Sequence, residues 1–287
     1  MNDDIKLAII GGSGLYNMEG LEGAMECNIE TPFGRPSAPI VIGSLNGQRV
    51  AFLARHGVGH HLMPGEVPYR ANIHALKSLG VERIVSISAC GSLREDYAPG
   101  HIVIPDQLYD NTKNRVSTFF GEGLVAHVGM ADPFCPDLSK QLEEAVRTAD
   151  AVVHPGGTFI TVEGPRFSTK AESNTYRAWG MSIIGMTAAP EAFLAREAEI
   201  CYAVMAHVTE YDVWHLSETP VTVEMVIRIL NKNTSIAQTA VRQLVKNLKL
   251  ERDCDCGHAV ANTILTKREN ISKEARKKLD LLVKKYI

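Results

Sequence analysis

The alternation of short apolar runs with amphipathic segments constrains the fold of this chain more than any other sequence feature. The apolar runs predict buried strands at residues 7–10, 40–42, 50–53, 84–87, 159–162, 183–184 and 200–208. Between them, Tyr69, Ile73 and Leu76 follow helical spacing, and residues 190–199 also read as a helix. Strands that alternate with helices predict an α/β protein whose sheet is covered on both faces.

Turn and cap residues set the expected ends of several elements. Asn46-Gly47 predicts a hairpin between the second and third strands. Gly80 ends the helix that contains Tyr69, and Thr219-Pro220 begins a later helix. One face of that later helix carries the apolar residues Val223, Val226, Ile227 and Leu230.

Composition narrows the classes of partner. The 287 residues carry a net charge of −3, so there is no global basic field for nucleic acid. No apolar run approaches the roughly 18–20 residues that cross a bilayer, and Met1-Asn2-Asp3-Asp4 is acidic, unlike a signal peptide. We therefore expect a soluble cytoplasmic protein that binds neither nucleic acid nor membrane.

Two acids follow the strand predicted at residues 200–208. Glu210 and Asp212 are separated by one residue, so their side chains point to the same side of an extended chain. Two carboxyl groups in a small space cannot both ionise cheaply, and one can keep its proton while the other stays anionic. Such a pair suits a ligand with an acceptor beside a donor, such as N7 and the 6-amino group of adenine.

Other strands end in residues that suit an anion. Gly11-Gly12-Ser13-Gly14 offers backbone N–H groups, but it lacks the P-loop lysine and the dinucleotide-binding glycine pattern, and it could be a plain turn. Arg55 and His56 supply donors, although a surface pair is an equal alternative. Ser88 and Thr187 add hydroxyls, which could otherwise only cap local turns. Ligand sites gather at such strand ends.

Metal ligands are not evident from the spacing of histidines and cysteines. Gly57 and Gly59 interrupt the helix that would align His56, His60 and His61. Four cysteines are spread widely along the chain and are predicted to be reduced thiols, namely Cys27, Cys90, Cys135 and Cys201. Cys254-Asp255-Cys256 is too close-spaced for a zinc knuckle by itself, and a bridge would strain its small ring. We interpret it as two thiols in a polar loop, with a redox-sensitive disulfide as the alternative.

The lysine-rich segment 267–285 has no comparable chemistry. Its positive residues predict the solvated face of a helix and not a nucleic-acid site.

Taken together, these segments resemble the trimeric purine nucleoside phosphorylases. The matching stretches run in one order from about residue 6 to the helix beyond 219, whereas the last 40 or so residues match poorly. They are Ile9-Ile10-Gly11-Gly12-Ser13-Gly14-Leu15, Thr31-Pro32-Phe33-Gly34, Leu53-Ala54-Arg55-His56-Gly57, Ala89-Cys90-Gly91-Ser92-Leu93-Arg94-Glu95, Asp132-Pro133-Phe134-Cys135-Pro136, Val162-Glu163-Gly164-Pro165-Arg166-Phe167-Ser168, Gly185-Met186-Thr187 and Thr209-Glu210-Tyr211-Asp212-Val213-Trp214.

The resemblance implies an architecture and an assembly. The expected fold is a single three-layer α/β domain over residues 1–287, with a mixed, twisted central sheet between helices and a weakly matching helical segment from about residue 248. The expected assembly is a homotrimer, or a dimer of trimers, in which Asp132-Pro133-Phe134 of a neighbour helps complete the pocket for the 5′ group. No metal or organic cofactor is expected. Inorganic phosphate would be a co-substrate and not a cofactor.

The resemblance also implies a reaction and its residues. Phosphate would cleave the glycosidic bond of 5′-methylthioadenosine, giving adenine and 5-methylthioribose 1-phosphate in methionine and purine salvage. Glu210, Asp212 and His56 would be catalytic. Phosphate would lie among Ser13, Arg55, His56, Ser88, Ala89 and Thr187. The nucleoside would contact Phe167, Ser168, Met186, Glu210, Asp212, His127, Val223, Val226 and Ile227.

Departures from the family pattern concern the breadth of substrates. Adenine-selective relatives usually carry Asp where this chain has Glu210, while 6-oxopurine enzymes usually carry Asn. Ser13 and Ser88 replace threonines of close relatives but keep the hydroxyl. A broader purine nucleoside phosphorylase or a methylthioinosine phosphorylase therefore stays open, and a nucleoside hydrolase or a nucleoside-binding protein is a more distant alternative.

Overall fold

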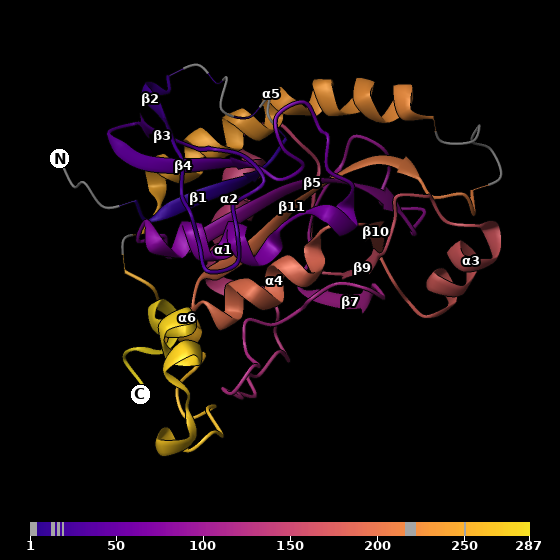
Figure 1. Cartoon of the computed structure of the whole chain (residues 1–287). Helices are drawn as coiled ribbons and strands as arrows, with labels where there is room; N and C mark the ends of the chain where they lie inside the picture. Colours follow the sequence, from indigo (N-terminus) through magenta and orange to yellow (C-terminus); the bar gives the residue numbers. More distant parts are fainter. Residues whose placement is uncertain (1–4, 13–14, 16–17, 19, 216–221, 250) are drawn as a thin grey trace.

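The computed structural model describes residues 5–12, 15, 18, 20–215, 222–249 and 251–287, and it leaves out the side chains of residues 225, 226 and 228–232. Within this part of the chain, the strands form one mixed sheet between two groups of helices (Figure 1). The strands are β1 (Leu7–Gly11), β2 (Glu22–Cys27), β3 (Ile40–Leu45), β4 (Gln48–Ala54), β5 (Arg83–Ser92), β6 (Ile102–Ile104), β7 (Gln107–Asn111), β8 (Val153–Pro155), β9 (Thr158–Val162), β10 (Ile183–Gly185) and β11 (Cys201–Tyr211). The α-helices are α1 (Tyr69–Ser78), α2 (Pro136–Arg147), α3 (Lys170–Ala178), α4 (Ala188–Glu197), α5 (Val223–Asn247) and α6 (Lys273–Val283).

Strand β5 is the centre of the sheet because it has three partners. It runs parallel to β1 on one side and to β11 on the other, and its last residues pair antiparallel with β10. The strand order β2-β3-β4-β1-β5-β10-β9-β7 continues from β5, with β11, β6 and β8 as a branch. The parallel strands β1, β4, β5 and β11 therefore present their carboxyl ends at one edge of the sheet.

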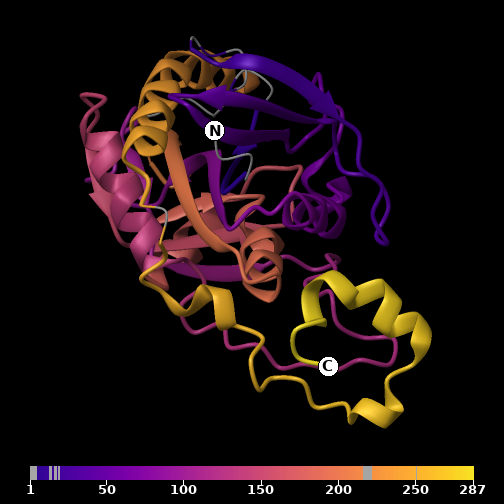
Figure 2. The ribbon, with the colours of Figure 1, turned by 90° about the vertical axis from the view of Figure 1, so that its left-hand side faces the viewer.

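Two apolar cores lie on opposite faces of the sheet. Along β11, Tyr202 and Val204 belong to the core that includes α1 and α4, whereas Ala203 and Met205 belong to the core that includes α2 and α5. Alternate side chains of a strand point to opposite faces, so a continuous apolar run means a sheet buried on both sides. The predicted α/β sheet with helices on both faces is confirmed (Figures 1 and 2).

Local turn chemistry agrees with the sequence. Asn46 and Gly47 both have positive φ, 52° and 78°, which is the pattern of a tight hairpin turn that joins β3 to β4. Gly80, with φ of 86°, follows the last turn of α1. Thr219-Pro220 lies outside the described residues.

Two strands are longer than predicted. The prediction ended the strand of β5 at Ile87, but pairing with β11 and β10 extends it to Ser92. The prediction also placed Glu210 after its strand, whereas β11 continues to Tyr211, with a register shift between Val208 and Glu210. Small and polar residues continue as strand here because neighbouring strands satisfy their backbone groups.

The C-terminal segment packs beside the loop that precedes α2. Ala126 forms an isolated bridge with Ile264, and Lys278 contacts Glu122 at 2.7 Å (Figure 2). Helix α6 buries Ala275, Leu279, Leu282 and Val283 and leaves most of its basic residues exposed, as predicted for a solvated face. No helix in the described ranges combines the length and apolar character that crossing a membrane requires.

Candidate active site

A cavity of about 620 Å³ opens at the carboxyl ends of β1, β4, β5 and β11. Its size is that of a typical small-molecule site, for which about 300–1,000 Å³ is usual. Strand ends and α5 supply its lining, which includes Gly12, Arg55, His56, Ser88, Ala89, Gly91, Phe167, Ser168, Met186, Thr187, His207, Glu210, Asp212, Ile227 and Asn233. The structure thus brings together most of the residues that the sequence singled out.

The two acids lie on one wall of this cavity. Burial raises the pKa of Glu210 to about 7, with the Thr209 hydroxyl opposing and the Asp212 charge adding to the shift. Burial also raises the pKa of Asp212, whose Oδ2 has no hydrogen-bond partner among the described residues. Gly91 faces both acids, and a Cβ there would lie 3.5 Å from Glu210 Oε1 and from Asp212 Cβ. The missing side chain leaves space beside the carboxyl pair.

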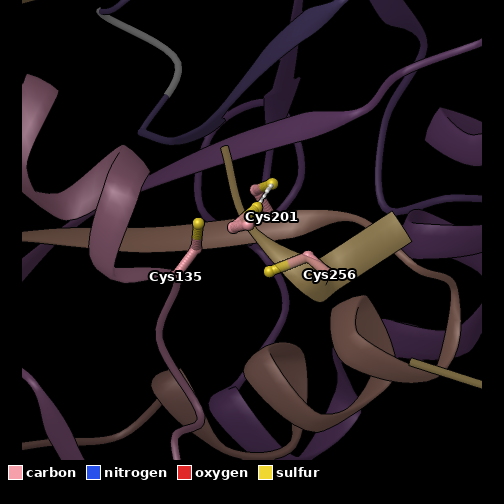
Figure 3. A group of neighbouring side chains, drawn as sticks. Cys135, Cys201 and Cys256 are labelled. Atoms are coloured by element: carbon pink, nitrogen blue, oxygen red, sulfur yellow. Dashed lines mark hydrogen bonds between the residues drawn. The ribbon is translucent and has the colours of Figure 1, made fainter. Parts of the chain in front are cut away.

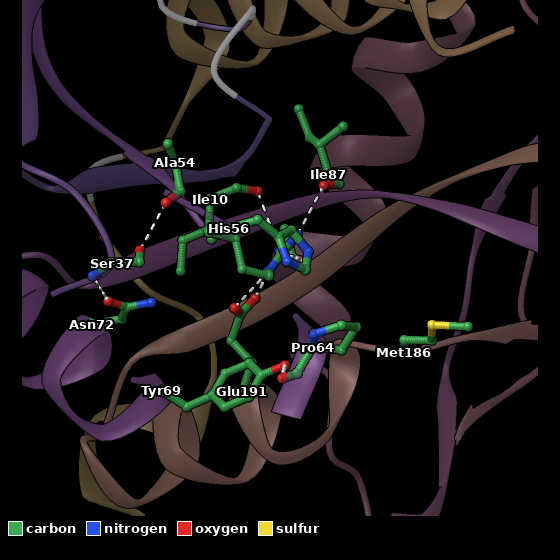
Figure 4. Close-up of polar contacts among 12 residues, drawn as sticks. Ile10, Ser37, Ala54, His56, Pro64, Tyr69, Asn72, Ile87, Met186 and Glu191 are labelled. Atoms are coloured by element: carbon green, nitrogen blue, oxygen red, sulfur yellow. Dashed lines mark hydrogen bonds and ion pairs between the residues drawn. The ribbon is translucent and has the colours of Figure 1, made fainter. Parts of the chain in front are cut away.

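Arg55 directly follows β4, lines the cavity and is buried. Its Nε and Nη2 form a two-pronged contact with Glu191 Oε2 and Oε1, at 2.8 and 2.9 Å. Its Nη2 also donates to Ser86 Oγ at 2.6 Å. Its Nη1 donates to the carbonyl of Ile87, which is labelled in Figure 4, at 3.3 Å. A guanidinium has five N–H donors, so these contacts leave one Nη1 donor for a ligand.

His56 lies beside Arg55 with a defined tautomer. Its Nδ1 lies 2.9 Å from the Leu62 carbonyl, so Nδ1 carries the hydrogen and Nε2 has the lone pair. Burial and the Arg55 charge lower the pKa of His56 to about 4. The ring is therefore neutral at pH 7 unless a bound anion raises its pKa.

Hydroxyl groups complete this end of the cavity. Ser88 Oγ is buried without a hydrogen-bond partner in the described part of the chain, although Ser88 lines the cavity. Thr187 is buried at the start of α4 and makes no cap bond with its side chain. Ala89 lies next to Ser88 in the lining, whereas Ser13 lies outside the described residues. An unpaired buried hydroxyl is costly, so these groups are arranged for a polar ligand.

Met186 also lines the cavity. Gly164 has φ of 67°, and a Cβ there would approach Met186 Sδ to 2.6 Å. Arg115 holds this region in place by donating to the Ala189 carbonyl at 2.8 Å and to the Glu163 carbonyl at 2.6 Å. Phe167 and Ser168 follow on the same loop, and Phe167 is exposed at the mouth of the cavity.

The predicted 5′ wall is only partly assembled within one chain. Ile227 lines the cavity and is half exposed, whereas Val223 is exposed and is not in the lining. The side chain of Val226 is outside the description. His127 is exposed, lies outside the cavity of its own chain and pairs its backbone N–H with the Thr263 carbonyl at 3.0 Å.

Sequence reasoning missed Glu191, Arg115, His207 and Asn233. Glu191 and Arg115 act through long-range contacts that no local pattern reveals. His207 has both ring nitrogens buried without partners in the described structure, and burial lowers its pKa to about 4. Asn233 Nδ2 is likewise unpaired, and both residues line the cavity. A polar residue within the apolar run 200–208 was the one signal for His207.

The sheet order and the site define a class of protein. The model of the phosphorylase superfamily matches residues 6–246, and the chain belongs to that superfamily. The chain is 52% identical over 281 residues to the S-methyl-5′-thioadenosine phosphorylase of Koribacter versatilis, an alignment that covers 98% of this chain and 96% of the relative.

Solved structures give the same result. A methylthioadenosine phosphorylase from an Antarctic soil metagenomic library is 50% identical, with a TM-score of 0.94 over 98% of this chain and 100% of that chain. Methylthioadenosine phosphorylase from Schistosoma mansoni in complex with tubercidin is 36% identical, with a TM-score of 0.82 over 89% of this chain and 96% of that chain. The expected nucleoside phosphorylase fold is confirmed.

Proposed function

We propose that this protein cleaves S-methyl-5′-thioadenosine with inorganic phosphate, giving adenine and 5-methylthioribose 1-phosphate. One observation carries the proposal: Glu210, a carboxyl group with a pKa near 7, lines the same cavity as Arg55 and the unpaired Ser88 hydroxyl. The similarity to proteins named for this activity supports the choice of substrate.

The acid end would stabilise the departing base. Cleavage of the C–N bond builds negative charge on the purine, and a proton delivered to N7 removes that charge. Glu210 keeps an appreciable neutral fraction at pH 7, because burial raises its pKa to about 7. Asp212 Oδ2 needs a hydrogen-bond donor, and the 6-amino group of adenine supplies one.

The cationic end would hold phosphate on the opposite face of the sugar. The free Nη1 donor of Arg55 and the hydroxyls of Ser88 and Thr187 suit phosphate oxygens. His56 Nε2 would accept a hydrogen from the phosphate, or donate once the dianion raises its pKa. Phosphate held there would stabilise the positive charge that develops on the sugar. By family resemblance, Ser13 and the backbone near Ala89 would add contacts.

Between the two ends, Met186 would lie under the ribose, and Phe167 and Ser168 would border the base. Ile227 would give the 5′-methylthio group an apolar neighbour, since an apolar wall disfavours a free hydroxyl. In the proposed homotrimer, or dimer of trimers, a neighbouring subunit would bring His127 to this pocket, and α5 would contribute Val223 and Val226. Of the predicted donor segment only Asp132 is exposed, because Pro133 and Phe134 are buried in their own chain.

A phosphate-dependent substrate panel tests the proposal. Turnover should require phosphate, produce a sugar 1-phosphate and give the highest kcat/KM with methylthioadenosine among methylthioadenosine, methylthioinosine, adenosine and inosine. Equal kcat/KM for inosine would favour a broad purine nucleoside phosphorylase. Turnover without phosphate would indicate a hydrolase, and binding without turnover would indicate a nucleoside-binding protein.

Three further features belong to the proposal. The reaction needs no cofactor, so activity should survive dialysis against a chelator. All 287 residues form one domain, so urea unfolding should follow a single transition. We also propose a cytoplasmic location, which cell fractionation tests.

A further inference from the structure

Four cysteines from three distant parts of the sequence meet at the end of the sheet opposite the cavity. Cys135 is the N-cap of α2, Cys201 begins β11, and Cys254 and Cys256 lie after α5. Their sulfur atoms all lie within 4.8 Å of one another, and all four are free thiols (Figure 3). The sequence predicted separate reduced thiols at Cys135 and Cys201, and their convergence with Cys254 and Cys256 was not foreseen.

We propose that these four cysteines bind one zinc ion as a structural tetrathiolate site. A zinc–sulfur bond of about 2.3 Å in a tetrahedron places ligand sulfurs about 3.8 Å apart. Cys201 Sγ and Cys254 Sγ are 3.4 Å apart, far from the 2.05 Å or so of a disulfide and close to the tetrahedral spacing. Four sulfur ligands also close the coordination sphere, as in structural zinc sites. The proposal revises the expectation of no metal site.

The charges around the cluster fit a metal–thiolate centre better than an ordinary apolar core. Binding of Zn²⁺ releases four thiol protons and leaves a centre with net charge −2. Arg196 Nη1 lies 3.5 Å from Cys256 Sγ, and the Arg252 guanidinium interacts with Cys201 and Cys254. Two cations thus lie beside a centre with two negative charges, and Arg252 also pairs with Glu82 at 3.7 Å.

Backbone features support the same arrangement. Leu138 N–H points at Cys135 Sγ over 3.4 Å, a contact that stabilises a thiolate ligand. Gly257 leaves space for the Arg252 guanidinium beside the cluster, because a Cβ at position 257 would lie 2.6 Å from Arg252 Nη2.

The position of the site indicates what the metal would do. Cys201 and Glu210 stand at opposite ends of β11, about 30 Å apart at the usual rise per residue. The ion would therefore not take part in the reaction. Cys254 and Cys256 lie beyond the 6–246 match to the superfamily model. The site would fix the C-terminal segment against the start of β11, beside Glu199, which accepts from Val260 N–H at 3.1 Å.

Metal analysis of the untagged full chain, purified under reducing conditions and supplied with Zn²⁺, tests the proposal. We expect one zinc per chain after gel filtration, and loss of that zinc in Cys254→Ser and Cys201→Ser. Cys27→Ser is the matched control, since Cys27 is a free thiol outside the cluster, and it should keep one zinc per chain. Co²⁺ in place of Zn²⁺ should give the visible absorption of tetrahedral cobalt thiolate.

A second variant leaves all four sulfurs in place. Arg252→Gln should lower the affinity for zinc about 10–100-fold, as loss of a residue that contacts the metal ligands does. Adenine binding by the same variant should be unchanged, which would show that the active site is still folded. Metal-free wild-type protein after reconstitution, one zinc retained in folded Cys254→Ser, or disulfides among the four cysteines in unreduced peptide maps would each overturn the proposal.

Discussion

Glu191 accepts two short hydrogen bonds from Arg55, although the two residues are 136 positions apart in the sequence. Both side chains are buried. Tyr202 OH donates to the same carboxylate at 2.8 Å. The pair fixes the direction of the guanidinium, and its contacts leave a single Nη1 donor for a ligand. Glu191 is thus a positioning residue, and its charge also limits how strongly Arg55 alone can attract phosphate.

Glu191→Gln should destabilise the fold and impair use of phosphate. Breaking a buried ion pair leaves an uncompensated charge and costs about 3–5 kcal/mol of unfolding free energy. A displaced guanidinium should lower kcat/KM for phosphate up to about 100-fold, whereas adenine affinity should stay nearly unchanged. Urea unfolding and steady-state kinetics measure these effects. The exposed Glu30, paired with Arg35, is the control, and Glu30→Gln should cost at most about 1 kcal/mol.

Glu210→Gln should retain nucleoside binding but lose rate. Losing the proton donor should slow single-turnover phosphorolysis of methylthioadenosine by about 10²–10⁴-fold. A nucleoside whose purine already carries positive charge at N7 should lose far less, because its base leaves without protonation. Unchanged single-turnover rates with methylthioadenosine would remove Glu210 from the mechanism.

The pH dependence should show one falling limb that belongs to Glu210. Because burial raises its pKa to about 7, the neutral form is present below that pH and is lost as the pH rises. We expect kcat/KM for methylthioadenosine to fall about tenfold for each pH unit well above 7. The pH profile of kcat/KM in Glu210→Gln shows how much of the fall comes from ionisation of phosphate. This variant should lack the part of the fall that belongs to Glu210. A limb of equal depth in both proteins would assign it to phosphate alone.

Ile227→Ser should weaken discrimination at the 5′ position. Removing apolar surface from the cavity should reduce the preference for methylthioadenosine over adenosine about tenfold, within the range for small apolar groups. The ratio of the two kcat/KM values is the measurement. Val152→Ser is the matched control, because Val152 is about as exposed as Ile227 but does not line the cavity. An equal effect of both variants would mean that Ile227 does not set the preference at the 5′ position.

Gly164→Ala should displace Met186. The new Cβ would lie 2.6 Å from Met186 Sδ, and the positive φ adds about 1–2 kcal/mol of strain. We expect KM for the nucleoside to rise in steady-state assays. Gly80→Ala carries the same backbone strain in open space, so it should lose similar stability and keep its KM. If the two variants have the same KM, Met186 does not contact the nucleoside.

The sequence alone determined the features that depend on neighbouring residues. Apolar runs, helical spacing and Asn46-Gly47 predicted strands, helices and a hairpin, because these patterns reflect local backbone preferences and burial. The acids Glu210 and Asp212 were identifiable because strand geometry places alternate residues on one side. Motif order added the phosphorylase resemblance, which the comparisons confirm.

Tertiary structure decided everything that depends on contacts between distant segments. Only the folded sheet extends β5 to Ser92, since pairing partners and not local propensity keep small residues extended there. Only folding joins Arg55 to Glu191 and gathers four cysteines around one point. The pKa of Glu210 is also a tertiary property, because removal from water, and not the sequence near the acid, is the main cause of its rise.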